Sequence, residues 1–252
     1  LAAQFDALAA HPEARAACTG VLIRYQGTDT ARRPDPALVT YAGFLAQVQA
    51  LAEGLHSLGV GRGDTVALML ANRPEFSLAD TAVMHLGATA FSVYNTSSAE
   101  QAQHVFRNAG NRVVVTERQF LPRVLESRTP EIEHIVLVDG SEVGTITLQD
   151  LARRRVPGFD FDSAWRAVQP DDVVTLIYTS GTTGPSKAVQ LTHGGVLFQT
   201  RGVAAMLGLQ TGGRSISYLP SAHVGDRCLT HYGGSLCFGN SVTSIPDHRQ
   251  VG

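Results

Sequence analysis

The residues with the clearest chemical potential lie in one short stretch that is rich in hydroxyl groups and glycine and ends in a lysine. It reads Tyr178-Thr179-Ser180-Gly181-Thr182-Thr183-Gly184-Pro185-Ser186-Lys187. The two glycines let the backbone adopt positive φ and approach a ligand closely, and successive backbone N–H groups in such a turn can form an anion-binding nest. The hydroxyls add hydrogen-bond donors and Lys187 adds a mobile point charge. The stretch therefore predicts a polyphosphate-binding loop.

The spacing of this loop distinguishes it from a Walker A loop. A Walker A loop has four residues between its glycines and Lys-Ser/Thr directly after the second one. Here two residues separate Gly181 from Gly184, and Ala188 follows Lys187. A flexible Gly/Ser/Thr linker is the structural alternative. The apolar, β-branched run at 173–177 is typical of a buried strand that enters the loop, so we favour a loop held by a rigid element.

The first 155 residues alternate between helical and strand patterns. Apolar residues at 44, 48, 51, 55 and 58 are spaced as on one face of a helix, which a glycine-rich turn at 59–64 would end. Further strands are predicted at 65–70, 88–94, 113–115 and 135–138, and further helices at 74–86, 99–109, 120–128 and 148–155. This alternation predicts an α/β fold with doubly wound, mostly parallel sheets and helices on both faces.

The remainder of the chain gives a weaker pattern. Residues 156–172 include Pro157, Gly158 and Pro170, and they are expected to form an irregular connector. After the loop, strands are predicted at 188–193, 215–219 and 241–245, with a helix that ends near residue 207. Between 228 and 240 apolar residues alternate with glycine, and no element is predicted there.

The length, composition and charge of the chain limit the classes of protein to which it can belong. The chain has 252 residues, with 44% hydrophobic and 17% charged residues, which is typical of one large globular α/β domain or two small ones. A net charge of −2 does not indicate the basic surface by which proteins bind nucleic acid. The sequence has no apolar run of about 18 residues and no signal-peptide pattern. Cys18, Cys228 and Cys237 show no metal-binding spacing, so we expect reduced thiols and a cytoplasmic location.

The loop closely resembles the phosphate-loop signature of the adenylate-forming superfamily, which includes acyl-CoA synthetases, aryl-CoA ligases, luciferases and peptide-synthetase adenylation domains. The usual continuation, Gly-x-Pro-Lys-Gly-Val, stands here as Gly-Pro-Ser-Lys-Ala-Val at 184–189. A second segment, Leu-Pro-Ser-Ala-His-Val-Gly-Asp-Arg at 219–227, is similar to the Leu-Pro-x-x-His-x-x-x-Arg segment of bacterial long-chain fatty-acyl-CoA synthetases. Residues 61–67, 72–76 and 95–101 resemble the N-terminal part of the family, so the resemblance covers nearly the whole chain.

The resemblance implies an AMP-forming ligase that converts a fatty acid and ATP to acyl-AMP and then transfers the acyl group to coenzyme A. It implies ATP, Mg²⁺ and coenzyme A as cofactors or co-substrates. The positions that match the ATP-binding loop are Thr179, Ser180, Gly181, Thr182, Thr183, Gly184 and Lys187. Thr179 also matches a position that contacts Mg²⁺. Lys187 and His223 are the expected catalytic residues, and His223 would line the carboxylate and adenylate pocket. The alternative for His223 is a structural histidine near a helix start.

Several motifs of the family do not occur in the sequence. There is no Tyr-Gly-x-Thr-Glu segment with its Mg²⁺-binding Glu, no later ribose-binding Asp and no lid carrying the catalytic lysine. By resemblance we expect residues 1–252 to form an incomplete N-terminal ATP-binding domain with little or no ligase activity alone. An acyl-AMP ligase, an aryl-CoA ligase and a non-catalytic nucleotide-binding fragment remain as alternatives. Peripheral membrane contact and oligomerisation are left open.

Overall fold

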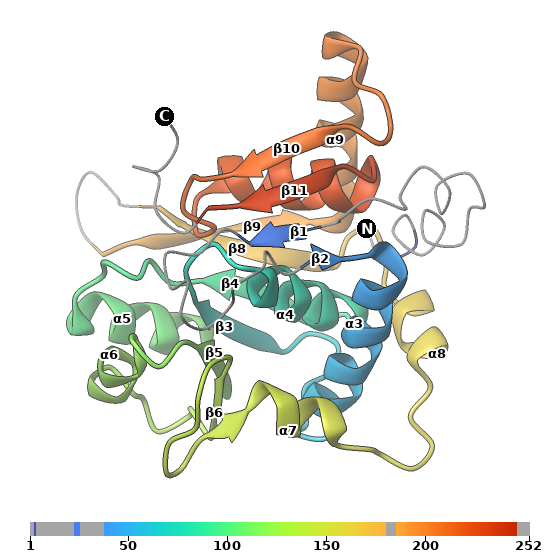
Figure 1. The fold of residues 1–252 in the computed structure, drawn as a ribbon. Coiled ribbons are helices and arrows are strands. Elements are labelled where there is room, and N and C mark those ends of the chain that lie inside the picture. The colour runs from blue at the N-terminus through green and yellow to red at the C-terminus, as the bar shows by residue number, and fades with distance from the viewer. Residues whose placement is uncertain (1–2, 4–22, 26–37, 180–184, 246–252) are drawn as a thin grey trace.

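The computed structural model describes residues 3, 23–25, 38–179 and 185–245, which form an α/β fold with two sheets (Figure 1). The larger sheet has the strand order β7-β6-β5-β3-β4-β8-β9. Its strands from β7 to β8 pair in parallel, and β9 is antiparallel to β8. The strands are β3 (Thr65–Met69), β4 (Thr89–Ser92), β5 (Val113–Thr116), β6 (His134–Leu137), β7 (Ile146–Thr147), β8 (Val173–Thr179) and β9 (Lys187–Thr192).

Helices cover both faces of this sheet. Along β3, Val66 and Leu68 pack into a core with α3 (Tyr41–His56), α4 (Pro74–His85) and α7 (Leu148–Arg153). The alternate residues Ala67 and Met69 pack into a second core with α5 (Ala99–Ala109) and α6 (Leu121–Glu126). Successive side chains of a strand point to opposite faces, so a strand buried on both sides is apolar throughout. The predicted doubly wound architecture is confirmed.

The smaller sheet joins the two ends of the described chain. Its order is β10-β11-β1-β2, in which β1 pairs in parallel with β11 and antiparallel with β2. The strands are β1 (Ile23–Tyr25), β2 (Leu38–Val39), β10 (Arg214–Ser217) and β11 (Ser241–Ser244). Helix α9 (His193–Leu207) follows β9 and rises beyond the smaller sheet at the top of Figure 1. No helix in the described ranges is long and apolar enough to cross a membrane.

Side-chain caps fix where two of the predicted helices begin. The Thr40 hydroxyl accepts a hydrogen bond from the Gly43 N–H, 3.1 Å away, at the start of α3. Ser98 and Gln101 form a reciprocal capping box at the start of α5. Each cap satisfies backbone donors that the first helical turn leaves unpaired. The segment after β4 therefore leads into α5 at a fixed angle.

Two predictions for the second half of the chain are wrong. The expected irregular connector contains helix α8 (Phe161–Arg166), whose first turn is capped by the Asp160 carboxylate. The segment without a predicted element forms η1 (Asp226–Cys237), a helix with π-type hydrogen bonds. Such a helix does not follow the 3.6-residue period by which helices are recognised in a sequence. Gly233 suits its wide turn, because a Cβ there would lie 2.9 Å from the carbonyl oxygen of Cys228.

The cysteines within the described ranges are free thiols. Cys228 and Cys237 are half-buried and pack against the first core. Burial raises the pKa of Cys237 to about 11 and also raises the pKa of Cys228. Such thiols remain protonated and unreactive at neutral pH. Cys18 lies outside the described residues.

Candidate functional site

The predicted phosphate loop connects β8 to β9, and its two ends meet. Thr179, the last residue of β8, is the cross-strand partner of Lys187, the first residue of β9. Both residues are exposed. The loop therefore starts and ends at one point, at the carboxyl end of a strand in a mostly parallel sheet. The predicted ATP-binding residues Ser180, Gly181, Thr182, Thr183 and Gly184 lie outside the described residues.

A cavity of about 830 Å³ lies beside these loop ends. It is bounded by the carboxyl ends of β4 and β8, the start of α5 and the turn that precedes η1. The lining includes Ser92, Val93, Tyr94, Glu100, His104, Val105, Ile177, Thr179, Ser186, His223 and Val224. Open α/β sheets bind ligands at the carboxyl ends of their strands. The structure thus brings Thr179 and His223 together in one cavity.

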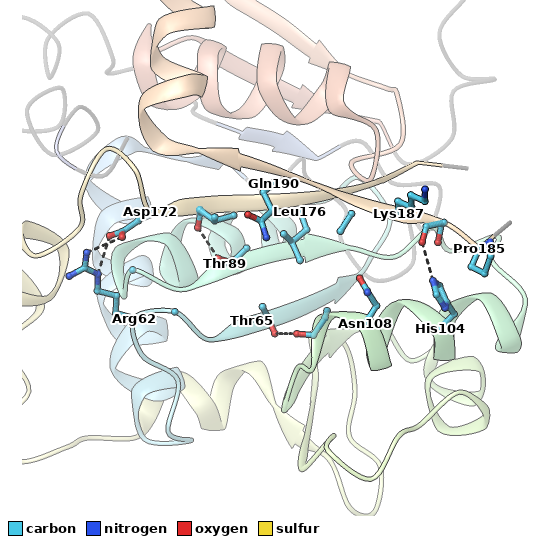
Figure 2. Close-up of a pocket in the computed structure, with 16 residues that line it drawn as sticks. Arg62, Thr65, Thr89, His104, Asn108, Asp172, Leu176, Pro185, Lys187 and Gln190 are labelled. Atoms are coloured by element: carbon cyan, nitrogen blue, oxygen red, sulfur yellow. Dashed lines mark hydrogen bonds and ion pairs between the residues drawn. The ribbon is translucent and has the colours of Figure 1, made fainter. Parts of the chain in front are cut away.

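A second cavity, of about 820 Å³, lies on the other side of the loop end that leads into β9. Lys187 lines this second cavity, whereas it is not among the residues that line the first. Figure 2 shows Lys187 and His104 near one end and the ion pair of Arg62 with Asp172 near the other. The two cavities share His104, Pro185 and Ser186. Lys187 and His223 therefore lie on different cavities, separated by these three residues.

His223 lies on an exposed turn that a buried side chain holds in place. The side-chain amide of Asn72 donates to the Ser217 hydroxyl at 3.0 Å and to the Leu219 carbonyl at 2.6 Å. Its carbonyl oxygen accepts from both the N–H and the hydroxyl of Ser221. A single buried amide thus ties the start of α4 to the residues just before His223.

The ring of His223 has a defined tautomer. Its Nδ1 accepts a hydrogen bond from the Gly225 N–H at 3.0 Å. A neutral imidazole that accepts through Nδ1 carries its proton on Nε2. His223 also has a structural part, because its carbonyl accepts from the Arg227 N–H at the start of η1. The position of His223 is therefore compatible both with a role in the carboxylate and adenylate pocket and with a structural role.

Arg227 has no role that the sequence predicts, yet it lies at the centre of a buried polar network. Its guanidinium is fully buried and pairs with Asp80 of α4. It also donates to the Ser92 hydroxyl at 2.5 Å, the Ala90 carbonyl at 3.1 Å and the Tyr232 hydroxyl at 3.0 Å. The Leu-Pro-x-x-His-x-x-x-Arg pattern includes an arginine at position 227, but it does not identify Asp80, 147 residues away, as the partner of this arginine. Arg227 fixes η1, and with it the turn that carries His223, to α4 and β4.

The same network sets the protonation of two buried carboxyl groups. Burial alone would raise the pKa of Asp80, but the charge of Arg227 and contacts with His231 outweigh it and lower the pKa. No arginine or lysine in the described part of the chain forms an ion pair with Asp226, and burial raises its pKa to about 6. The Ser217 hydroxyl donates to its Oδ2 at 3.0 Å and stabilises the charged form only in part. Asp226 therefore titrates far closer to neutrality than an ordinary aspartate.

The residues of the first cavity fit a nucleotide-bound Mg²⁺ better than a metal held by protein alone. Within the described ranges, no group of three or more His, Cys, Asp or Glu side chains is arranged to hold a metal. Thr179 supplies an exposed hydroxyl oxygen, and the exposed Glu100 carboxylate lines the same cavity. Mg²⁺ commonly takes one or two protein oxygens, with water and substrate phosphates completing its shell. The contact of Thr179 with Mg²⁺ stays a prediction.

Curated relatives match parts of this chain. The mycobacterial protein Rv1549 of Mycobacterium tuberculosis, described as uncharacterised, is 55% identical over 103 residues, which cover 41% of this chain and 58% of that protein. Putative fatty-acid–CoA ligase FadD11 of the same species is 49% identical over 109 residues, 43% of this chain and 19% of FadD11. Long-chain-fatty-acid–CoA ligase FadD15 of Mycobacterium bovis is 33% identical over 197 residues, 76% of this chain and 33% of FadD15. The matches thus span less than two thirds of each relative.

Solved structures share the fold. The structure of O-succinylbenzoate coenzyme A synthetase (MenE) from Bacillus subtilis in complex with AMP superimposes with a TM-score of 0.69 at 26% identity, over 90% of this chain and 52% of MenE. The MenE complex with ATP and magnesium ion gives a TM-score of 0.71 at 24% identity, over 92% of this chain and 44% of that chain. The family model described as AMP-binding enzyme matches residues 7–250. With this match and these neighbours, the chain belongs to the AMP-binding, adenylate-forming enzyme family.

Proposed function

We propose that this chain provides the ATP-binding part of an enzyme that activates a fatty acid as acyl-AMP and then forms acyl-CoA. The observation that carries the proposal is the joint position of Thr179 and His223 on one cavity at the carboxyl ends of β4 and β8. Thr179 belongs to the phosphate loop and His223 to the segment that resembles fatty-acyl-CoA synthetases. The activity proposed is that of a whole enzyme, whereas this chain matches less than two thirds of the length of each relative.

In the first half-reaction a carboxylate oxygen bonds to the α-phosphorus of ATP, and the bond between this phosphorus and pyrophosphate breaks. Charge builds up on the leaving phosphates, and fixed donors that stabilise this charge lower the barrier. Lys187 would hold the β- and γ-phosphates, and Thr179 would hold the bound Mg²⁺. Mg²⁺ supplies further charge neutralisation when it is bound with ATP. The Nε2–H of His223 would orient the attacking carboxylate.

In the second half-reaction the coenzyme A thiolate attacks the acyl carbon, and AMP leaves with the bonding electron pair. A fatty acid as acyl donor is supported by two observations. The cavity is lined in part by apolar side chains, among them Val93, Val105, Ile177 and Val224. FadD11 and FadD15 are both described as fatty-acid–CoA ligases.

A binding experiment tests the proposal without requiring turnover by this chain. The probe is dodecyl-AMP, a stable alkyl ester that resembles an acyl adenylate, and binding is measured by calorimetry against AMP and benzyl-AMP. The proposal expects dodecyl-AMP to bind at least about tenfold more tightly than AMP, because burial of a few methylene groups adds more than this factor. Preference for benzyl-AMP would favour an aryl-acid ligase. Equal affinity for all three compounds would contradict acyl recognition by this cavity.

A further inference from the structure

Helix α5 contacts strand β8 and the residue just before β9, at the base of the phosphate-loop hairpin. On its inner face, Ala102, Val105 and Phe106 are buried in the second core, and its first turn is capped by Ser98 and Gln101. This helix is therefore a fixed platform beside the hairpin.

Two side chains one helical turn apart reach from this platform to the hairpin. Asn108 accepts a hydrogen bond of 2.8 Å from the hydroxyl of Tyr178 on β8. His104 lies 3.0 Å through its Nε2 from the carbonyl oxygen of Ser186, the residue before β9. Residues four apart lie on the same side of a helix, so α5 contacts β8 and the residue before β9 with one face. Figure 2 shows His104 directed at this end of β9.

The contact of His104 requires a donor. A carbonyl oxygen can only accept, so Nε2 of His104 must carry the proton that it shares with Ser186. The bonded carbonyl directly precedes the backbone N–H of Lys187. His104 is also one of the three residues that line both cavities, so the bond lies in the wall between them.

We propose that His104 is a positioning residue that sets the place of Lys187 by holding the Ser186 carbonyl. The Tyr178–Asn108 bond fixes β8, and the His104 bond fixes the first residues of β9 against the same helix. The benefit of this position for phosphate binding rests on the function proposed above, whereas the hold on Lys187 does not. The two parts can therefore be tested separately.

The hold on Lys187 can be measured by proteolysis, because Lys187 is the only lysine in the sequence. Endoproteinase Lys-C then cuts the chain at one site, and cutting requires β9 to separate locally from its neighbours. His104→Leu and His104→Phe remove the donor, whereas His104→Gln keeps an N–H at similar reach. We expect about fivefold faster cleavage for the first two variants, as loss of one ordinary hydrogen bond predicts, and a rate close to that of the original chain for His104→Gln.

A matched control separates this local effect from general destabilisation. His134 is a partly exposed histidine on β6 that lines neither cavity, so His134→Leu should leave the cleavage rate unchanged. Urea unfolding identifies any variant whose faster cleavage reflects lower global stability. Unchanged cleavage in His104→Leu and His104→Phe, or equally fast cleavage in His104→Gln, would overturn the proposal.

The functional part is tested by titration with Mg-ATP. His104→Leu should weaken binding about fivefold, His104→Gln should not, and His104→Leu combined with Lys187→Ala should bind like Lys187→Ala alone. If Lys187→Ala weakens binding and His104→Leu does not, the positioning role is wrong while the proposed function stands. If the unchanged chain does not bind Mg-ATP, the proposed function fails, and the cleavage rates alone decide whether His104 holds Lys187.

Discussion

Thr179 and Lys187 face each other as cross-strand partners at the open end of the antiparallel pair β8–β9. Eight positions apart in sequence, they become neighbours because the loop between them starts and ends on one edge of the sheet. The backbones of a threonine and a lysine thus stand side by side at the loop entrance, and their side chains line two different cavities. The open end of this strand pair is the expected base of a polyphosphate-binding loop.

The position of His223 leads to a prediction about adenylate binding. Its side chain is exposed in the first cavity, and its Nδ1 is engaged by Gly225, which leaves Nε2–H as the donor for a ligand. We expect His223→Ala to weaken dodecyl-AMP binding by about fivefold to tenfold, through loss of one hydrogen bond to the ester oxygen that corresponds to the attacking carboxylate oxygen. Calorimetry on His223→Ala and on the control His134→Ala checks this. A histidine with only a structural role would lower the urea midpoint and leave the affinity of the folded protein unchanged.

The buried pair of Arg227 and Asp80 leads to a prediction about stability. Arg227→Met leaves the Asp80 carboxylate buried without its main counter-charge, so we expect a loss of about 3–5 kcal/mol in the free energy of unfolding. The combination Arg227→Met with Asp80→Leu removes both charges and should recover part of this loss. Urea unfolding of the two variants measures both effects. A loss below about 1 kcal/mol in the single variant would mean that the pair is not a buried network.

The raised pKa of Asp226 leads to a prediction about pH. The folded protein binds the Asp226 proton more tightly than the unfolded chain does, because its pKa of about 6 lies above the ordinary value of 3.8. This contribution to stability is fully present below pH 3.8 and is lost as the pH rises through 6. Asp226→Asn, which cannot ionise, should therefore be more stable than the original chain at pH 7.5, by up to about 3 kcal/mol.

The comparison of Asp226→Asn with the original chain at two pH values provides the control. At pH 4, where Asp226 is largely protonated when folded, the two melting temperatures should nearly coincide. An advantage of the Asn variant that is as large at pH 4 as at pH 7.5 would point to packing or hydrogen bonding instead of ionisation.

The elements that could be predicted from the sequence are those whose signal is local. The capping residues Thr40 and Ser98 and the apolar run of β8 depend on neighbours within a few positions, and their elements lie where predicted. Helix η1 could not be predicted, because its π-type period and paired glycines resemble no standard helical pattern. The residue types of the loop at 178–187 predict a polyphosphate site by themselves, whereas a role for His223 is implied by resemblance alone.

The contacts that organise the site could not be predicted from the sequence, because they join segments that are far apart along the chain. Arg227 meets Asp80, Asn72 meets Ser221, and His104 meets Ser186 across separations of 147, 149 and 82 residues. A single sequence gives the type of each residue but not its partner. The separation of Lys187 and His223 into two cavities is likewise a consequence of tertiary packing around residues 185 and 186.

The most direct test of an ATP site at the end of β8 and β9 is a calorimetric titration of this chain with Mg-ATP, repeated with Lys187→Ala. The matched control is Arg214→Ala, which removes an exposed cation on β10 that lines neither cavity. We predict saturable binding of one Mg-ATP, weakened about tenfold or more by Lys187→Ala, as loss of a charge-assisted hydrogen bond implies, and unchanged by Arg214→Ala. Absence of binding, or equal affinity of the Lys187→Ala and Arg214→Ala variants, would contradict an ATP site at the end of β8 and β9.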